Sequence, residues 1–159
     1  CSNFVSLVYK DFGYTVTSTA RKYNTVGTKV EGVYSEKLST GKWTLVGVDK
    51  LRPGDIFTFW ATDSNGAKYI SHVALYMGVV NGKPCIINTA KDHPTAIGII
   101  NGFSYWYGEQ LYEVRRVLPD SAYTPHNSSV KLSSPVIPAV YQLKPQNPIV
   151  MPKDLAVGF

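Results

Sequence analysis

Residues 51–89 read LRPGDIFTFWATDSNGAKYISHVALYMGVVNGKPCIINT, and this stretch decides the expected fold. A turn at Pro53-Gly54 precedes the apolar run 56–60, which predicts a buried strand. Asn65-Gly66 and Asn81-Gly82 favour tight hairpin turns, and each dipeptide separates two runs of strand-forming residues. The stretch therefore predicts three consecutive antiparallel strands that form a meander sheet.

Upstream of this stretch, residues 1–14 read CSNFVSLVYKDFGY and predict an amphipathic helix that ends at Gly13. A cysteine on the first turn of a helix lies near unpaired N–H groups and the positive end of the helix dipole. Both favour the thiolate, which is the nucleophilic form of the side chain. A helix followed by antiparallel strands predicts an α+β domain in which the helix packs on the sheet. Apolar residues recur in the helix at three- and four-residue spacing: Cys1, Phe4, Val5, Val8, Tyr9 and Phe12.

The remaining parts of the domain are less regular in pattern. Residues 14–50 are polar and rich in Thr, Gly and Lys, and we expect an irregular segment there. Within it we expect a short helix near 18–23 and a hairpin near 42–48. A substrate-facing loop and a solvated connection are both open interpretations of this segment. Further along, residues 111–117 read LYEVRRV and predict a final strand that pairs back onto the sheet.

The last quarter of the chain has a different composition. It holds seven of the ten prolines, interleaved with Ser and Asn, and this composition disfavours helices and central strands. We therefore expect one domain over residues 1–118 and an extended Pro-rich segment over residues 119–159. The many apolar residues of this segment predict that it wraps around the domain. A linker and a partner-binding arm are the alternatives.

Composition limits the function further. The chain has 159 residues, enough for one domain with a sizeable core. Its two cysteines, Cys1 and Cys85, are too few for a disulfide framework or a metal cluster, and we expect no metal and no organic cofactor. A net charge of +5 and a pI near 9.2 suit an anionic partner: a cell wall, a membrane surface or nucleic acid. Scattered basic residues make nucleic acid the weakest of these, and no stretch is long enough for a transmembrane segment. Nothing in the sequence indicates the oligomeric state.

Two polar residues in the meander are candidate partners for the Cys1 thiol. His72 lies near the start of the second expected strand, where a general base for the thiol would be needed. Asn88 lies in the next strand and is the best candidate for orienting the imidazole, ahead of Asp92 and His93 in an apparent turn. A lone histidine is more often structural, but the presence of Cys1 favours the catalytic interpretation.

Three other interpretations of Cys1 remain open. It could carry a lipid, although such cysteines are normally followed by a flexible polar tether rather than by a helix. It could be an amino-terminal nucleophile that uses its own α-amine as base, although that fold places the nucleophile on a strand. It could also be a buried core thiol, which is the commonest state of a cysteine.

Taken together, these motifs resemble the NlpC family of papain-like cysteine peptidases, which are bacterial cell-wall endopeptidases and amidases. The resemblance rests on Cys-Ser at a helix start, Pro-Gly-Asp-Ile-Phe-x-Phe, Ser-His-Val-Ala-Leu-Tyr-Met-Gly and Ile-Ile-Asn-Thr-Ala, in that order. It covers about the first ninety residues. The family also has an aspartate just before the cysteine and a tyrosine further upstream, and neither lies in this sequence; Asn3 stands where a glycine is common.

The resemblance implies a papain-like α+β fold and a role for each matching residue. Cys1 is the expected nucleophile, His72 the expected base, and Asn88 the third polar residue, which in the family is often a histidine. Ser2 matches the serine that follows the nucleophile and is a candidate substrate-binding residue. Asp55 matches the aspartate of the Gly-Asp turn and is expected to be structural.

The implied activity is hydrolysis of amide bonds in the stem or cross-bridge peptides of peptidoglycan, through a thioester. A secreted, periplasmic or cell-envelope location follows from that substrate. The alternatives are a papain-like toxin or effector that acts on a protein as deamidase, protease or acyltransferase, and an inactive cell-wall binding module. The aromatic residues Tyr105 and Trp106 could bind substrate by stacking, although packing in the core is the more usual role of such residues.

Overall fold

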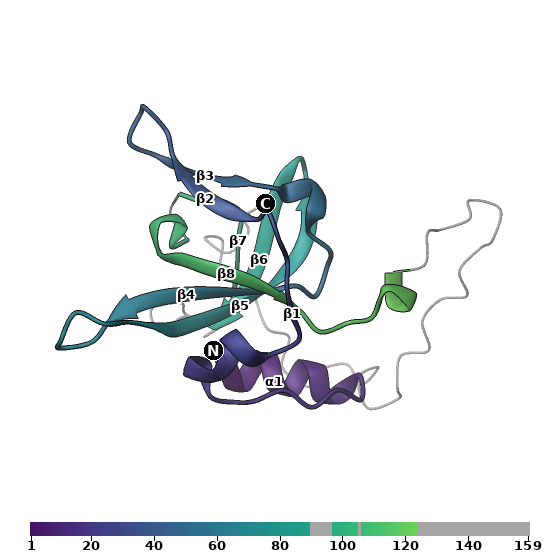
Figure 1. The fold of residues 1–159 in the computed structure, drawn as a ribbon. Coiled ribbons are helices and arrows are strands. Elements are labelled where there is room, and N and C mark those ends of the chain that lie inside the picture. Colours follow the sequence, from purple (N-terminus) through teal and green to yellow (C-terminus); the bar gives the residue numbers. More distant parts are fainter. Residues whose placement is uncertain (90–96, 105, 124–159) are drawn as a thin grey trace, which may run out of the picture.

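A six-stranded antiparallel sheet forms the centre of the molecule (Figure 1). The computed structural model describes residues 1–89, 97–104 and 106–123. The expected α+β class is confirmed: the described part combines a mostly antiparallel sheet with few helices. In chain order the elements are the helix α1 (Ser2–Asp11), the 3₁₀ helix η1 (Ala20–Thr25), strands β1 (Thr28–Lys29), β2 (Tyr34–Lys37) and β3 (Trp43–Val46), η2 (Val48–Lys50), β4 (Ile56–Thr62), β5 (Lys68–Val80), β6 (Lys83–Thr89), β7 (Ile97–Ile100), η3 (Gly108–Gln110), β8 (Leu111–Arg116) and η4 (Asp120–Tyr123).

Four consecutive strands of the sheet form a meander, and the last strand of the domain pairs with the first strand of that meander. Strands β4, β5, β6 and β7 pair in sequence order, while β8 returns to the free edge of β4 and β1 pairs with β8. The three expected meander strands and the final strand over residues 111–117 are confirmed. The short edge strands β1 and β7 were not predicted. None of the described helices combines the length and the apolar character needed to cross a membrane.

Two backbone features explain why the predicted boundaries hold. Asn81 and Gly82 both have positive φ, 50° and 77°, as a two-residue type I′ hairpin turn requires between β5 and β6. Gly13 has φ 83°, the left-handed conformation that commonly ends a helix. In each place the residue type that the sequence supplies is the one that tolerates the conformation.

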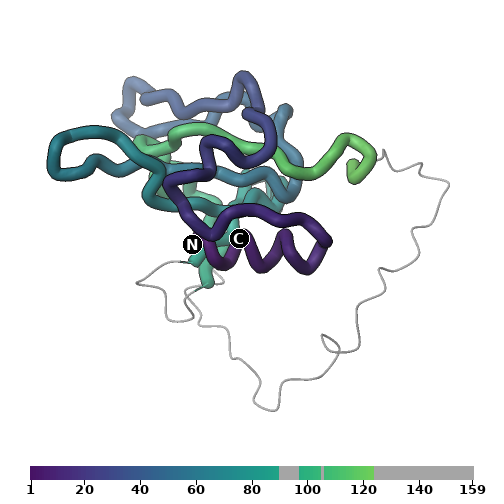
Figure 2. The backbone as a smooth tube through the Cα atoms, turned by 60° about the horizontal axis from the view of Figure 1, so that its bottom comes forward, coloured from purple at the N-terminus to yellow at the C-terminus, as the bar shows by residue number. Residues whose placement is uncertain are grey.

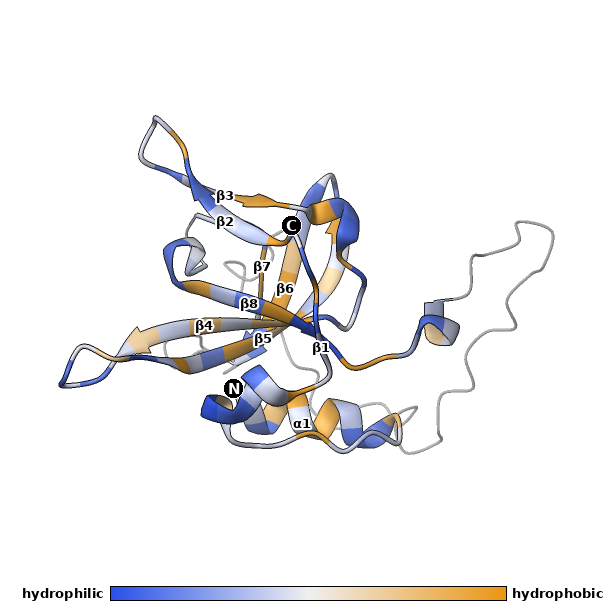
Figure 3. Cartoon of the chain, viewed as in Figure 1, coloured by the Kyte–Doolittle hydropathy of each residue, from blue (hydrophilic) through white to orange (hydrophobic). Residues whose placement is uncertain are grey.

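Each face of the sheet buries its own apolar core. The helix α1 lies across one face, with its polar residues turned away from the sheet (Figures 2 and 3). Within β5, strand alternation places Val73 and Leu75 in the core under α1 and Ala74 and Tyr76 in the opposite core. The core under α1, here the helix-side core, contains Val5, Tyr9, Tyr23, Val26, Ile56, Ile70, Val73 and Leu75. The opposite core contains Val30, Val33, Leu51, Phe57, Phe59, Ala74, Tyr76, Ile86, Phe103, Trp106, Leu111 and Val114.

The segment between α1 and β4 differs in detail from the sequence expectation. The expected hairpin near 42–48 is wrong in position, because residues 43–46 form only its second strand, β3, and the first strand is β2. The turn lies at residues 38–42, where the amide of Leu38 donates to the carbonyl of Lys42. Strand β3 ends at Val46, and Gly47 then starts η2 in the left-handed conformation. The expected helix near 18–23 is the 3₁₀ helix η1, displaced toward the carboxyl terminus.

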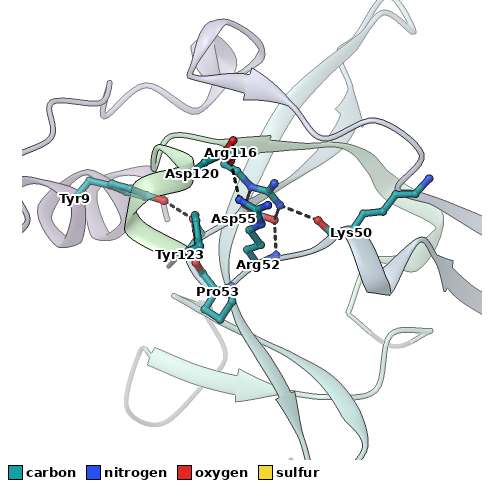
Figure 4. Close-up of polar contacts among 9 residues, drawn as sticks. Tyr9, Lys50, Arg52, Pro53, Asp55, Arg116, Asp120 and Tyr123 are labelled. Carbon is teal, nitrogen blue, oxygen red and sulfur yellow. Dashed lines mark hydrogen bonds and ion pairs between the residues drawn. The ribbon is translucent and has the colours of Figure 1, made fainter. Parts of the chain in front are cut away.

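A buried ion pair ties the turn before β4 to the last strand (Figure 4). Asp55 is fully buried, and its carboxylate accepts from Arg116 Nε and Nη2, both at 2.7 Å, and from the backbone N–H of Arg52 at 2.8 Å. The hydroxyl of Tyr9 donates to the carbonyl of Gly54 in the same turn. This network, here the turn clamp, joins α1, β4 and β8. The structural role expected for Asp55 agrees with these contacts.

Candidate active site

Cys1 immediately precedes α1 and occupies its N-cap position. Its carbonyl accepts the first backbone hydrogen bond of the helix, from the amide of Val5 at 3.2 Å. The side chain is half-buried and packs against the helix-side core. The thiol is therefore held at the amino-terminal end of the helix, where the macrodipole favours negative charge.

His72 and Asn88 come from the neighbouring strands β5 and β6 and contact each other. His72 Nε2 lies 3.2 Å from Asn88 Oδ1, and Asn88 is 1 % exposed. The amide nitrogen of Asn88 donates to the carbonyl of Gly98 on β7 at 3.4 Å, which directs the amide oxygen toward the histidine. Because an amide oxygen only accepts, Nε2 carries the ring proton. The other ring nitrogen, Nδ1, is then the atom with a free lone pair.

The surroundings of His72 keep the imidazole neutral. Burial lowers its pKa below the ordinary value of 6.5, the hydrogen bond to Asn88 acts in the opposite direction, and the positive charge at the amino terminus of Cys1 lowers it further. A neutral ring is the form that can accept a proton from a thiol.

Two aromatic rings hold His72 in place. The ring centroids of Phe59 and Tyr107 lie 5.9 Å and 5.5 Å from that of His72. Tyr107 is 44 % exposed and has φ 65°, a conformation that is uncommon for a bulky residue and that marks functional or strained sites. This role of Tyr107 was not predicted from the sequence, although the residue directly follows the aromatic candidates Tyr105 and Trp106.

Cys1 and His72 contact different layers of the domain. His72 contacts residues on the side of the opposite core, whereas Cys1 packs with the helix-side core, and α1 contacts β5 directly (Figure 1). Within the described residues the Cys1 thiol has no hydrogen bond to His72. Nucleophile and base in ligand-free enzymes often lie farther apart than in the substrate complex. Use of His72 as a base for Cys1 would require the thiol and Nδ1 to come within hydrogen-bond distance when substrate binds.

Ser2 holds the segment that follows α1. Its hydroxyl donates to the carbonyl of Ser18 at 2.6 Å, and its carbonyl accepts from the hydroxyl of Tyr23 at 3.2 Å. Both contacts are internal to the domain. In the structure Ser2 fixes η1 beside the first turn of α1, and its role in binding substrate stays a prediction.

The aromatic candidates divide into a core residue and one outside the description. Trp106 is 1 % exposed and packs between Phe57 and Phe103, with ring centroids 5.4 and 4.9 Å away. It presents no surface to a ligand in this conformation, so the expectation of stacking on substrate is corrected in favour of core packing. Tyr105 lies outside the described residues.

The described residues contain neither the other candidates for orienting His72 nor a metal site. Asp92 and His93 lie outside the described residues, as does most of the Pro-rich segment 119–159. Within residues 1–89, 97–104 and 106–123, no three His, Cys, Asp or Glu side chains are grouped as a metal site would need. A cavity of about 590 Å³ between α1 and η4 contains none of the three catalytic candidates.

The lowered pKa of His72 predicts the acidic limb of the pH–rate profile. If His72 is the base, protonation of the ring removes activity, and the midpoint of the acidic limb should lie below pH 6.5. The measurement is kcat/KM for amide cleavage against pH. An acidic limb at or above pH 6.5 would contradict the buried, neutral imidazole.

Replacing Asn88 with Ala tests the orienting role of this side chain. Loss of the Nε2 hydrogen bond frees the ring to rotate, and kcat/KM should fall roughly 10- to 100-fold. Because the bond to Asn88 raises the pKa of His72, its removal should also move the acidic limb to lower pH. Asn88→Gln is the matched control that keeps an amide. A drop in rate with an unmoved acidic limb would show that Asn88 is only structural.

Comparison with known proteins adds no relative, since no protein-family model matches the chain and no curated protein matches its sequence.

Proposed function

We propose that this chain is a cysteine hydrolase that cleaves amide bonds, with Cys1 as nucleophile, His72 as general base and Asn88 as the residue that orients the imidazole. The observation that carries the proposal is the hydrogen bond between His72 Nε2 and Asn88 Oδ1. A buried amide that fixes the ring with Nδ1 unprotonated suits a general base better than a structural histidine, which would use both nitrogens.

The proposed reaction begins when Nδ1 of His72 takes the proton from the Cys1 thiol. The thiolate attacks the carbonyl carbon of the amide, and the C–N bond breaks as the imidazolium returns the proton to the leaving amine. Water, deprotonated by His72, then attacks the resulting thioester. The C–S bond breaks, the carboxylic acid product leaves, and the proton held by His72 restores the thiol. No oxidant or metal takes part in this sequence.

Peptidoglycan stem or cross-bridge peptides are the proposed substrate, and a papain-like fold of the NlpC type belongs to the same proposal. Support comes from the order of the four sequence motifs and from a cysteine at the start of a helix that packs on a meander sheet. The net charge of +5 is compatible with an anionic wall. A secreted, periplasmic or cell-envelope location follows from this substrate.

Incubation with purified sacculi tests the function directly. Mass spectrometry of the released fragments should show new peptide termini with the wild-type chain and none with Cys1→Ala. The termini would identify the bond that is cleaved. Intact sacculi together with a reactive Cys1 would overturn the wall substrate and favour a protein target.

The absence of a thiol–imidazole hydrogen bond among the described residues favours one second candidate, a non-catalytic cell-wall binding module that has kept the fold. Alkylation of Cys1 by iodoacetamide near neutral pH separates the two candidates. An activated thiol should react faster than free cysteine, while Cys85, which is fully buried and whose pKa burial raises, should react slowly and serve as internal control. A Cys1 no faster than free cysteine would support the binding module.

A further inference from the structure

The cavity of about 590 Å³ between α1 and η4, here the apolar cavity, has no part in the proposed reaction. It lies where the helix, the sheet and the end of the described domain meet. Among the described residues that line it, none is charged. Its volume is in the usual range for ligand pockets, about 300–1,000 Å³. Apolar side chains enter its wall from α1 and its C-cap, from β5 and β6, and from the segment around η4: Val8, Phe12, Leu75, Ile87, Leu118 and Ala122.

Polar groups in the turn beside the apolar cavity are already paired within the domain. The hydroxyl of Tyr9 donates to the carbonyl of Gly54. The hydroxyl of Tyr123 donates to the carbonyl of Pro53 at 2.9 Å, and the amide of Gly54 donates to the carbonyl of Tyr76 at 2.8 Å. Because these groups have partners, an occupant of the cavity gains its binding energy mainly from the burial of apolar surface.

The apolar cavity opens to solvent between the end of α1 and η4. Phe12, which lines it at the end of the helix, is 74 % exposed, and Ala122, which lines it from η4, is exposed as well. A large exposed aromatic side chain beside an apolar cavity is typical of a surface that another segment or molecule covers. The opening therefore faces the point at which the described chain ends.

The chain itself supplies an apolar segment that follows the rim of this cavity. Tyr123 is the last described residue before the segment 124–159, and its hydrogen bond to Pro53 fixes it beside the cavity. Residues 136–143 read VIPAVYQL, in which six of the eight residues are apolar and none is charged. Prolines at 135, 138 and 145 disfavour a helix or a central strand that could bury these side chains. Contact with an existing apolar surface is the remaining way to remove them from water.

We propose that residues 136–143, here the apolar tail segment, dock into the apolar cavity of their own chain. Residues 124–135 connect this segment to Tyr123, and a chain of that length can span up to about 40 Å. The segment can therefore return to a cavity whose rim includes Ala122. A short covalent tether raises the local concentration of the segment to the order of millimolar, which favours it over a separate apolar ligand. The docking is independent of the proposed hydrolase and assigns a position to the Pro-rich segment.

Binding of 8-anilinonaphthalene-1-sulfonate to the full chain tests the docking, because this dye fluoresces on exposed apolar surface. The wild-type chain should bind the dye weakly, since the apolar tail segment fills the cavity. The double variant Ile137→Asp/Val140→Asp should raise the fluorescence roughly threefold or more, because charged side chains do not enter an apolar cavity. Val150→Asp/Val157→Asp is the matched control, with the same substitutions outside the segment, and it should cause no rise.

Limited digestion with chymotrypsin tests the docking from the cavity side. This protease cuts after Tyr141, within the apolar tail segment, and after Leu155, outside it. Docking protects the first bond, because cleavage requires the segment to leave the cavity. Phe12→Gln should speed the cut after Tyr141 roughly three- to tenfold by removing apolar contact, and it should leave the cut after Leu155 unchanged. Leu7→Gln is the control: Leu7 is 59 % exposed on the same helix and is not among the described residues that line the cavity.

Three results would overturn the docking. Equal dye fluorescence in the wild-type chain and in Ile137→Asp/Val140→Asp would show that the cavity is open to a separate apolar partner. An equal rise in both double variants would show that residues 136–143 are not the specific occupant. A wild-type dimer in sedimentation analysis that Ile137→Asp/Val140→Asp dissociates would show that the segment of a second copy fills the cavity. None of these measurements uses amide cleavage, so their failure leaves the proposed hydrolase untouched.

Discussion

The His72→Ala variant should cleave an amide substrate about 100- to 10,000-fold more slowly than the wild-type chain under the proposed mechanism, because this is the range that general-base catalysis typically contributes. The same variant should alkylate more slowly at Cys1, since the imidazole no longer accepts the thiol proton. The measurements are kcat for cleavage and the iodoacetamide rate constant. Both effects have one physical cause, the loss of the unprotonated Nδ1.

Two controls keep this result interpretable. Removal of the ring leaves Asn88 Oδ1 buried without its partner, which should reduce stability by about 1–3 kcal/mol, so the thermal midpoint is measured in parallel. His72→Gln returns a hydrogen-bond donor to Asn88 but no base, and it should be as inactive as His72→Ala. A His72→Gln variant with wild-type turnover would refute the catalytic role of His72.

Replacing Arg116 with Met should lower the free energy of unfolding by about 3–5 kcal/mol. The change leaves the fully buried carboxylate of Asp55 without the guanidinium that accounts for two of its hydrogen bonds. It also removes the donor to the carbonyl of Lys50, at 2.8 Å. Urea unfolding monitored by circular dichroism measures the loss.

Arg52→Met is the matched control for this variant. Arg52 pairs with Asp120 at the same short range, 2.8 Å, but the two side chains are 39 % and 93 % exposed. Water screens such a pair, so its removal should cost at most about 1 kcal/mol. Equal losses in the free energy of unfolding for the two variants would show that the contribution of Arg116 to stability does not depend on the burial of the turn clamp.

The elements with local signals could be predicted from the sequence, and those defined by distant pairing could not. The turn dipeptides at 65–66 and 81–82 set the boundaries of β4, β5 and β6 because their conformations are specified locally. Strand β1 has only two residues, and it exists because they meet Arg115 and Arg116 on β8. No local pattern of residues encodes such a pairing.

The candidate site shows the same division. His72 and Asn88 could be paired from the sequence, because strands joined by a tight hairpin are neighbours and a polar residue amid apolar ones needs a partner. Tyr107 could not be assigned to the imidazole, because its contact depends on the path of the chain between β7 and β8. Trp106 was ambiguous for the same reason: the sequence shows aromatic residues but not which of them the core encloses.

The order in which the chain can fold follows from the place of β8 in the sheet. The β4, β5 and β6 hairpins need only local contacts, but Asp55 stays without its guanidinium until Arg116 arrives from 61 residues further along. Burying a carboxylate alone is strongly unfavourable, so the sheet and the helix that the turn clamp fastens to it should consolidate together and late. On the ribosome, the helix that carries Cys1 would therefore not be fixed to the sheet until the last strand of the domain had been synthesised.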